Sequence, residues 1–286
     1  MKWMIVADSS CDLKTLDTKS PEIGYDTVPF VMDVDGREFV DDENISVPEM
    51  VDAMEKAGKS HSACPSPEAW RALFEKADHI IALTISGRLS GSYNSAMVGK
   101  SMALEDHPEK QIEVIDSLST GPKLVMLAQN AARQIQEQIP FETVCASCRE
   151  LARSVRTIFT LSSFHNLVQN GRVNRIAGFI AGKLGIRVIG VGSEEGEIQL
   201  KELMRGEKGT LRRVVKDMEE NGYRGTPMTV SHCLNEDLAR KLIEMIQNRW
   251  QEAKVQLLPT RGLDSYYAER SGLIICYGKG PAPGMA

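Results

Sequence analysis

The stretch Ser86-Gly87-Arg88-Leu89-Ser90-Gly91-Ser92 directly follows the apolar run Ile80–Ile85. The apolar run is typical of a buried strand, and the serines and glycines after it predict a turn into a helix that begins near Tyr93. Such a turn presents free backbone N–H groups and hydroxyls at a helix N-terminus, where a negative charge is stabilised. The stretch therefore predicts a ligand with a carboxylate or phosphate end.

Length and composition narrow the class of protein. The 286 residues are enough for two domains with separate cores, and 42% hydrophobic and 26% charged residues are ordinary for a soluble protein. The net charge of −5 argues against a nucleic-acid-binding protein. No apolar run is long enough for a signal-peptide core or a membrane span. We therefore expect a cytoplasmic protein without integral membrane association.

Strand-like and helical patterns alternate along the first half of the chain, which predicts an α/β domain with a mainly parallel sheet at residues 1–153. Ser66 and Pro67 mark the start of one helix. The expected strands are Trp3–Ala7, Ile80–Ile85 and Ile112–Ile115, with an extended hairpin over Val28–Val40 that turns at Asp35-Gly36. Functional loops are expected at the carboxyl ends of the strands.

The second half of the chain predicts an α+β domain with a mixed sheet at residues 154–286. Ile186–Val191 and Ile198–Leu203 flank the turn Glu194–Glu197 and indicate an antiparallel hairpin. The further expected elements are strands at Thr157–Leu161, Met228–His232, Val255–Leu258 and Leu273–Cys276, and helices at Ile176–Leu184 and Glu236–Gln251.

Six cysteines in a chain of this length do not indicate a disulfide framework. Cys145 and Cys148 form a C-x-x-C pair inside an expected helix, Glu142–Arg153, whereas a thioredoxin-type pair needs its first cysteine at a helix start. The sequence holds no second pair to complete a zinc site. We interpret the two cysteines as helix packing and expect neither a metal nor a cofactor.

Small polar loops follow three of the expected strands: Asp8-Ser9-Ser10, Ser86–Ser92 and Asp116–Gly121. Strand-to-helix turns need such residues for capping alone, but ligands of open α/β sheets also bind where these loops converge. The spacing around Ser90 does not match the Gly-x-Ser-x-Gly elbow of hydrolases, because Gly87 lies three residues before it and Gly91 directly after it. The phosphate-loop and dinucleotide fingerprints are also absent from the sequence. We expect a binding site without catalytic residues.

Several short motifs follow one another over most of the chain. They are Asp8-Ser9-Ser10-Cys11-Asp12-Leu13, Pro65-Ser66-Pro67, Leu89-Ser90-Gly91-Ser92-Tyr93-Asn94-Ser95-Ala96, Val114-Ile115-Asp116-Ser117, Gly171-Arg172-Val173 and Arg205-Gly206. Each motif is weak by itself. In this order and spacing they make the chain resemble the DegV family of bacterial fatty-acid-binding proteins.

The resemblance implies two domains that hold one long-chain fatty acid in a tunnel between them. It also implies a carrier that presents the carboxylate to a separate fatty acid kinase and is not itself an enzyme. The family's carboxylate-holding hydroxyls match Ser62 and Ser90, and its arginine matches Arg172. A buried carboxylate must be hydrogen-bonded, and a backbone N–H near Gly91 would add a donor. Ile176–Leu184 would line the tunnel.

Two stretches depart from the family's pattern. Ser62-Ala63-Cys64-Pro65-Ser66 stands where Thr-Ser-Gln-Pro-Ser is usual, and Asp264–Gly272 stands where a His followed by Gly-Pro-Gly is usual. Arg88 replaces a glycine, and we expect it to be a second cation at the opening of the site. Two alternatives stay open. One is a binding protein on the same scaffold for another amphiphile or a small anion, without a kinase role; the other is an enzyme that uses Asp8 or Asp116.

Overall fold

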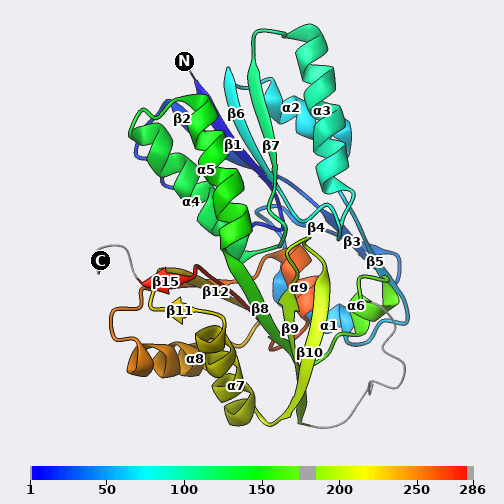
Figure 1. Ribbon diagram of the computed structural model, residues 1–286. Coiled ribbons are helices and arrows are strands. Elements are labelled where there is room, and N and C mark those ends of the chain that lie inside the picture. Colours follow the sequence, from blue (N-terminus) through cyan, green and yellow to red (C-terminus); the bar gives the residue numbers. More distant parts are fainter. Residues whose placement is uncertain (1, 174–184, 282–286) are drawn as a thin grey trace.

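A parallel sheet organises the first half of the molecule (Figure 1), in a computed structural model that describes residues 2–173 and 185–281. Within these residues the strand order is β2-β1-β6-β7, and every pair in it is parallel. The strands are β1 (Trp3–Asp8), β2 (Ile23–Val28), β6 (His79–Thr84) and β7 (Gln111–Asp116). The mainly parallel α/β fold expected from the sequence is confirmed. The helix expected at Ile176–Leu184 lies outside the described residues.

Helices cover both faces of this sheet, so its strands are buried on both sides. Ile5 and Ala7 face one core and Met4 and Val6 face the other, as the two-residue period of a strand requires. Helices α2 and α3 lie on one side, and α4 and α5 on the other (Figure 1). Their bounds are α2 (Pro67–Phe74), α3 (Ser92–Asp106), α4 (Pro122–Gln136) and α5 (Phe141–Ser154).

The second half contains a mixed sheet, as expected. Its order among the described residues is β10-β9-β8-β14-β12-β13, with β12 and β13 parallel and the other pairs antiparallel. These strands are β8 (Arg156–Leu161), β9 (Ile186–Gly192), β10 (Ile198–Arg205), β12 (Met228–His232), β13 (Val255–Pro259) and β14 (Leu273–Tyr277). Helices α7 (Glu207–Glu220) and α8 (Glu236–Arg249) pack on one face around Val230 and Ile275. A small pair, β11 (Tyr223–Arg224) with β15 (Gly280–Pro281), completes this half.

A third layer lies against the other face of the mixed sheet. It holds β3 (Val31–Val34), β4 (Arg37–Val40), β5 (Ser60–Ala63), α1 (Val47–Met54), α6 (His165–Gln169) and α9 (Gly262–Ala268). Phe30 and Met32 share one core cluster with Phe159 and Tyr266. The expected hairpin turns at Asp35-Gly36, but Val28 ends β2 in the parallel sheet, and neither β2 nor β5 was expected from the sequence. The domain boundary at 153/154 stays a prediction.

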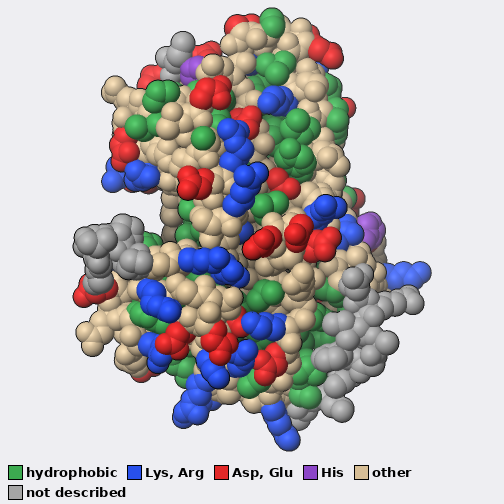
Figure 2. Space-filling model, in the orientation of Figure 1, with side chains coloured by type: hydrophobic (Ala, Val, Ile, Leu, Met, Phe, Trp, Pro, Cys, Tyr) green, Lys and Arg blue, Asp and Glu red, His purple; other side chains and the backbone are tan. Residues whose placement is uncertain are grey.

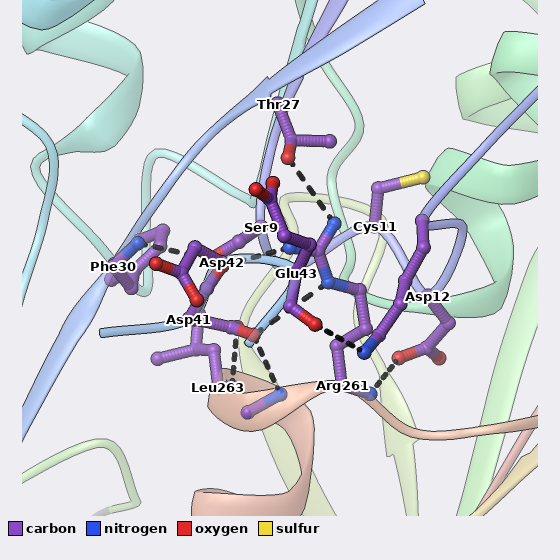
Figure 3. A network of polar contacts seen from close by, with 12 residues as sticks. Ser9, Cys11, Asp12, Thr27, Phe30, Asp41, Asp42, Glu43, Arg261 and Leu263 are labelled. Atoms are coloured by element: carbon purple, nitrogen blue, oxygen red, sulfur yellow. Dashed lines mark hydrogen bonds and ion pairs between the residues drawn. The ribbon is translucent and has the colours of Figure 1, made fainter. Parts of the chain in front are cut away.

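A buried polar network joins the start of α9 to the first half of the chain (Figure 3). The Asp41 carboxylate accepts hydrogen bonds from the backbone N–H groups of Gly262 (2.9 Å) and Leu263 (2.8 Å), so it caps this helix across 221 residues of sequence. The Arg261 guanidinium donates to the carbonyl oxygens of Leu13 (3.1 Å) and Asp41 (2.8 Å). The two halves are therefore linked by directional bonds as well as by apolar packing.

The C-x-x-C pair is packing, as the sequence indicated. Cys145 and Cys148 lie inside α5 and are buried in the core beneath it. Burial raises the pKa of the Cys145 thiol to about 12 and that of Cys148 to about 11, so both stay protonated and weakly nucleophilic near neutral pH.

On the face shown in Figure 2, acidic and basic side chains are interspersed.

Candidate functional site

A cavity of about 380 Å³ lies between the two halves of the molecule. Most of its wall is aliphatic or aromatic, contributed by Phe30, Ile85, Leu89, Leu118, Phe159, Leu161, Leu167, Ile198, Leu263 and Ile274. These residues come from the loops of the parallel sheet, from the mixed sheet, and from α6 and α9. An apolar cavity of this size with a few polar groups is the usual form of a small-molecule site.

The polar part of the wall contains four of the five residues expected from the sequence. Ser62, Ser90, Gly91 and Arg172 line the cavity. Cys64 also lines the cavity, and its Sγ would lie 3.4 Å from a Cβ on Gly91. Two serines, a glycine and an arginine that lie far apart in sequence therefore line one cavity.

The remaining expected residue, Arg88, is not among the residues that line the cavity. It lies in the turn before Ser90 and is exposed to solvent. Arg172 is also exposed, but it lines the cavity, and its Nη1 donates to the carbonyl oxygen of Asn170 (3.1 Å). Of the two arginines, the structure thus brings Arg172 to the candidate site.

Asp8 shapes the loop that carries Ser90. Its Oδ2 accepts hydrogen bonds from the Ile85 N–H (2.9 Å) and from the Ser92 hydroxyl (2.7 Å), which fixes both ends of the turn. Burial raises the pKa of Asp8 to about 6 despite these bonds. The Ser90 Oγ in turn accepts the Ser92 N–H (3.2 Å). Its hydroxyl hydrogen has no acceptor among the described residues, so it can be donated to a ligand.

Asp116, at the end of β7, fixes neighbouring loops in a similar way. Its carboxylate accepts the backbone N–H groups of Leu118 (2.8 Å) and Gly87 (3.1 Å) and so ties two loops together. Neither Asp8 nor Asp116 lines the cavity. The two carboxylates that the enzyme alternative would use are therefore bonded to groups of the surrounding loops and are not part of the cavity wall.

The β9–β10 turn closes the cavity from the second half of the chain. The Ser86 hydroxyl donates to the Gly196 carbonyl oxygen (2.8 Å), and Gly196 has a φ of 86°. A Cβ at this position would lie 2.3 Å from the Ser86 Oγ. Glycine is thus needed both for the backbone conformation and for the close approach of the two loops.

Sequence reasoning missed two polar residues of α9 that line the cavity, Asp264 and Tyr267. The Tyr267 hydroxyl lies 2.8 Å from the Ser62 Oγ. Both belong to the stretch that departs from the family's pattern. That departure was a signal that this wall of the site is built differently, but it did not reveal which side chains face the cavity.

Asp264 lies beside a second carboxyl group. A Cβ on Gly121 would lie 2.1 Å from Asp264 Oδ2 and 2.8 Å from Asp12 Oδ2, so the two carboxyl groups are close neighbours. Burial, and then the nearby charge of Asp12, raise the pKa of Asp264 well above its usual range, and burial raises that of Asp12 to about 7. The raised pKa favours the neutral form of Asp264, which repels an anionic ligand less than a carboxylate would.

Two further properties concern the described residues alone. In residues 2–173 and 185–281, no group of three or more His, Cys, Asp or Glu side chains is arranged to hold a metal ion. Within the same ranges, no helix has the length and apolar character to cross a bilayer.

Comparison with known proteins identifies relatives over nearly the full chain. Residues 2–268 match the family described as "Uncharacterised protein, DegV family". A DegV domain-containing protein of Streptococcus pneumoniae is 37% identical over 278 residues, which cover 97% of this chain and 99% of that protein.

Solved structures show the same fold. The Streptococcus pneumoniae fatty acid kinase (Fak) B3 protein, loaded with linoleic acid, is 36% identical with a TM-score of 0.94, over 98% of this chain and 100% of that one. A DegV family protein of Eubacterium eligens, loaded with heptadecanoic acid, is 35% identical with a TM-score of 0.92, over 97% and 100%.

Proposed function

The chain belongs to the DegV family, and we propose that it binds a long-chain fatty acid and presents its carboxylate to a separate fatty acid kinase. One observation carries the proposal: a mostly apolar cavity has Ser62, Ser90 and Gly91 together in its wall. Two relatives of about one-third identity were crystallised with fatty acids, and one of them is named the fatty acid kinase (Fak) B3 protein. The protein would act in the cytoplasm as a carrier rather than as a catalyst.

The two parts of the cavity fit the two parts of this ligand. Each methylene that leaves water contributes roughly 0.8 kcal/mol, so a chain of about 16 carbons supplies most of the driving force. The carboxylate must keep hydrogen-bond donors when it leaves water. The hydroxyls of Ser62 and Ser90 and the Gly91 N–H are such donors, and Arg172 supplies a positive charge nearby.

Ligand extraction from the purified protein, followed by mass spectrometry, tests the proposal directly. A long-chain fatty acid in near-stoichiometric amount is expected. An isoprenoid, another amphiphile or a small acid in its place would contradict the fatty-acid assignment and favour a different ligand on the same scaffold.

The head-group assignment has its own test in the double variant Ser62→Ala/Ser90→Ala. Loss of two hydrogen bonds to a charged group should weaken fatty-acid binding at least about a hundred-fold. Ser101→Ala is the matched control, because Ser101 lies on the exposed side of α3 and donates to the Met97 carbonyl oxygen (3.2 Å). Unchanged affinity in the double variant would remove these serines from the site.

A further inference from the structure

Two adjacent tyrosines on α9 face the same strand but have different surroundings. The Tyr266 hydroxyl donates to Ser60 Oγ (2.8 Å) and accepts from Asn170 Nδ2 (2.9 Å), and the residue is fully buried. Tyr266 is therefore an anchor whose hydrogen-bonding capacity is used within the protein. It fixes α9 against β5.

Tyr267 makes the corresponding contact with Ser62, two residues further along β5. Its hydroxyl lies 2.8 Å from the Ser62 Oγ, and both residues line the cavity. Ser60 and Ser62 are two residues apart on β5, so their side chains lie on the same face of the strand. Among the described residues, Ser62 is the one hydrogen-bond partner of the Tyr267 hydroxyl. Tyr267 is half-buried, and its hydroxyl can form further hydrogen bonds with a ligand.

Hydrogen-bond chemistry limits what can complete this pair. Two hydroxyls bonded to each other use one hydrogen and leave the other free. The Ser90 oxygen accepts the Ser92 N–H, and its hydroxyl hydrogen has no acceptor among the described residues. The pair of Ser62 and Tyr267 and the Ser90 hydroxyl thus offer two unused hydrogens. A group that only accepts hydrogen bonds, such as an ionised carboxylate, satisfies both of them, whereas an alcohol brings a further hydrogen and no charge.

We propose that Tyr267 is a specificity-determining residue: with Ser62 it forms a two-hydroxyl clamp that selects an ionised carboxylate over a neutral head group. The inference rests on the proposed function, since it concerns the head group of the same ligand.

Affinities of the wild type, Tyr267→Phe and Tyr266→Phe for palmitic acid and for cetyl alcohol test the inference. Phenylalanine keeps the ring and removes only the hydroxyl. Tyr267→Phe should weaken binding of the acid roughly ten-fold and change binding of the alcohol less than two-fold. Tyr266→Phe should lower stability, because it leaves buried Ser60 and Asn170 without a partner, and leave the ratio of acid to alcohol affinity unchanged.

The outcomes separate the two proposals. If the wild type binds the acid and Tyr267→Phe binds it equally well, or loses acid and alcohol affinity in parallel, the clamp is refuted while fatty-acid binding stands. An equal change of the ratio in Tyr266→Phe would refute it too, because the effect would then come from the position of α9. A wild type that does not bind the acid would overturn the proposed function, and the clamp with it.

Discussion

Substitution of Arg261 by alanine should be among the most destabilising single changes in this protein. Arg261 is 3% exposed, and its guanidinium donates to Leu13 O, Asp41 O and Thr27 Oγ1 (3.3 Å) while its Nε lies 3.6 Å from Asp41 Oδ1 (Figure 3). Removing one member of a buried ion pair leaves the other charge uncompensated and costs about 3–5 kcal/mol. The lost packing of the arginine stem acts in the same direction.

Arg270 is the matched control for this experiment. It also contacts two carboxylates, Asp52 and Glu55 (2.5 Å each), but its side chain is 42% exposed. Exposed ion pairs are worth about 0–1 kcal/mol, so Arg270→Ala should shift the midpoint of urea unfolding only slightly. An Arg261→Ala loss no larger than that of Arg270→Ala would refute the reasoning that burial makes the difference.

The pH dependence of the Arg261→Ala defect provides a second check. Burial already raises the pKa of Asp41, and Arg261 counteracts this rise. Without the arginine, the pKa of Asp41 in the folded state rises further above its value in the unfolded state. Between these two pKa values the folded state binds more protons than the unfolded state. Stability of the variant should therefore fall more steeply than that of the wild type as the pH increases through this window. Unfolding curves at several pH values measure the slope.

Three further changes test other parts of the structure. Gly196→Val should push the β9–β10 turn away from Ser86 and raise the dissociation rate of the ligand several-fold, measured by stopped-flow fluorescence. Asp12→Asn should flatten the pH dependence of stability. Burial raises the pKa of Asp12 to about 7, so the folded wild type binds an extra proton and loses stability as the pH rises from about 4 to 7. Unfolding of wild type and variant at about pH 5 and about pH 8 measures the difference. Ser66→Ala removes the acceptor of the Ala69 N–H at the start of α2 and should lower the free energy of unfolding by about 1 kcal/mol in urea titrations.

Local signals in the sequence were sufficient for most of the elements. Ser66 and Pro67 start α2, where the hydroxyl accepts the Ala69 N–H (3.3 Å), and the run Ile80–Ile85 contains nearly all of β6. Strand β2 (Ile23–Val28) was missed because its sequence, IGYDTV, has neither a continuous apolar run nor a clear alternation. Its place at the edge of the sheet explains why such a sequence is tolerated.

The residues of the candidate site also divide into those that the sequence indicated and those that it did not. Ser90 and Gly91 belong to a strand-to-helix turn, so local reasoning pointed to them, while Ser62 and Arg172 came from the family resemblance. Tyr267 could not be found by either route, because its contact with Ser62 spans 205 residues and depends on how α9 lies against β5. No pattern within a window of sequence encodes such a pairing.

The position of Tyr267 depends on residues that never touch the cavity. Asp41 holds the first turn of α9 through the Gly262 and Leu263 N–H groups, and Tyr266 holds its last turn through Ser60. Since α9 contains only seven residues, these two anchors leave Tyr267 little freedom to move away from Ser62. The buried network that joins the two halves therefore also fixes the hydroxyl geometry of the head-group wall. For this reason head-group selectivity and folding stability are expected to be coupled through one short helix rather than encoded separately.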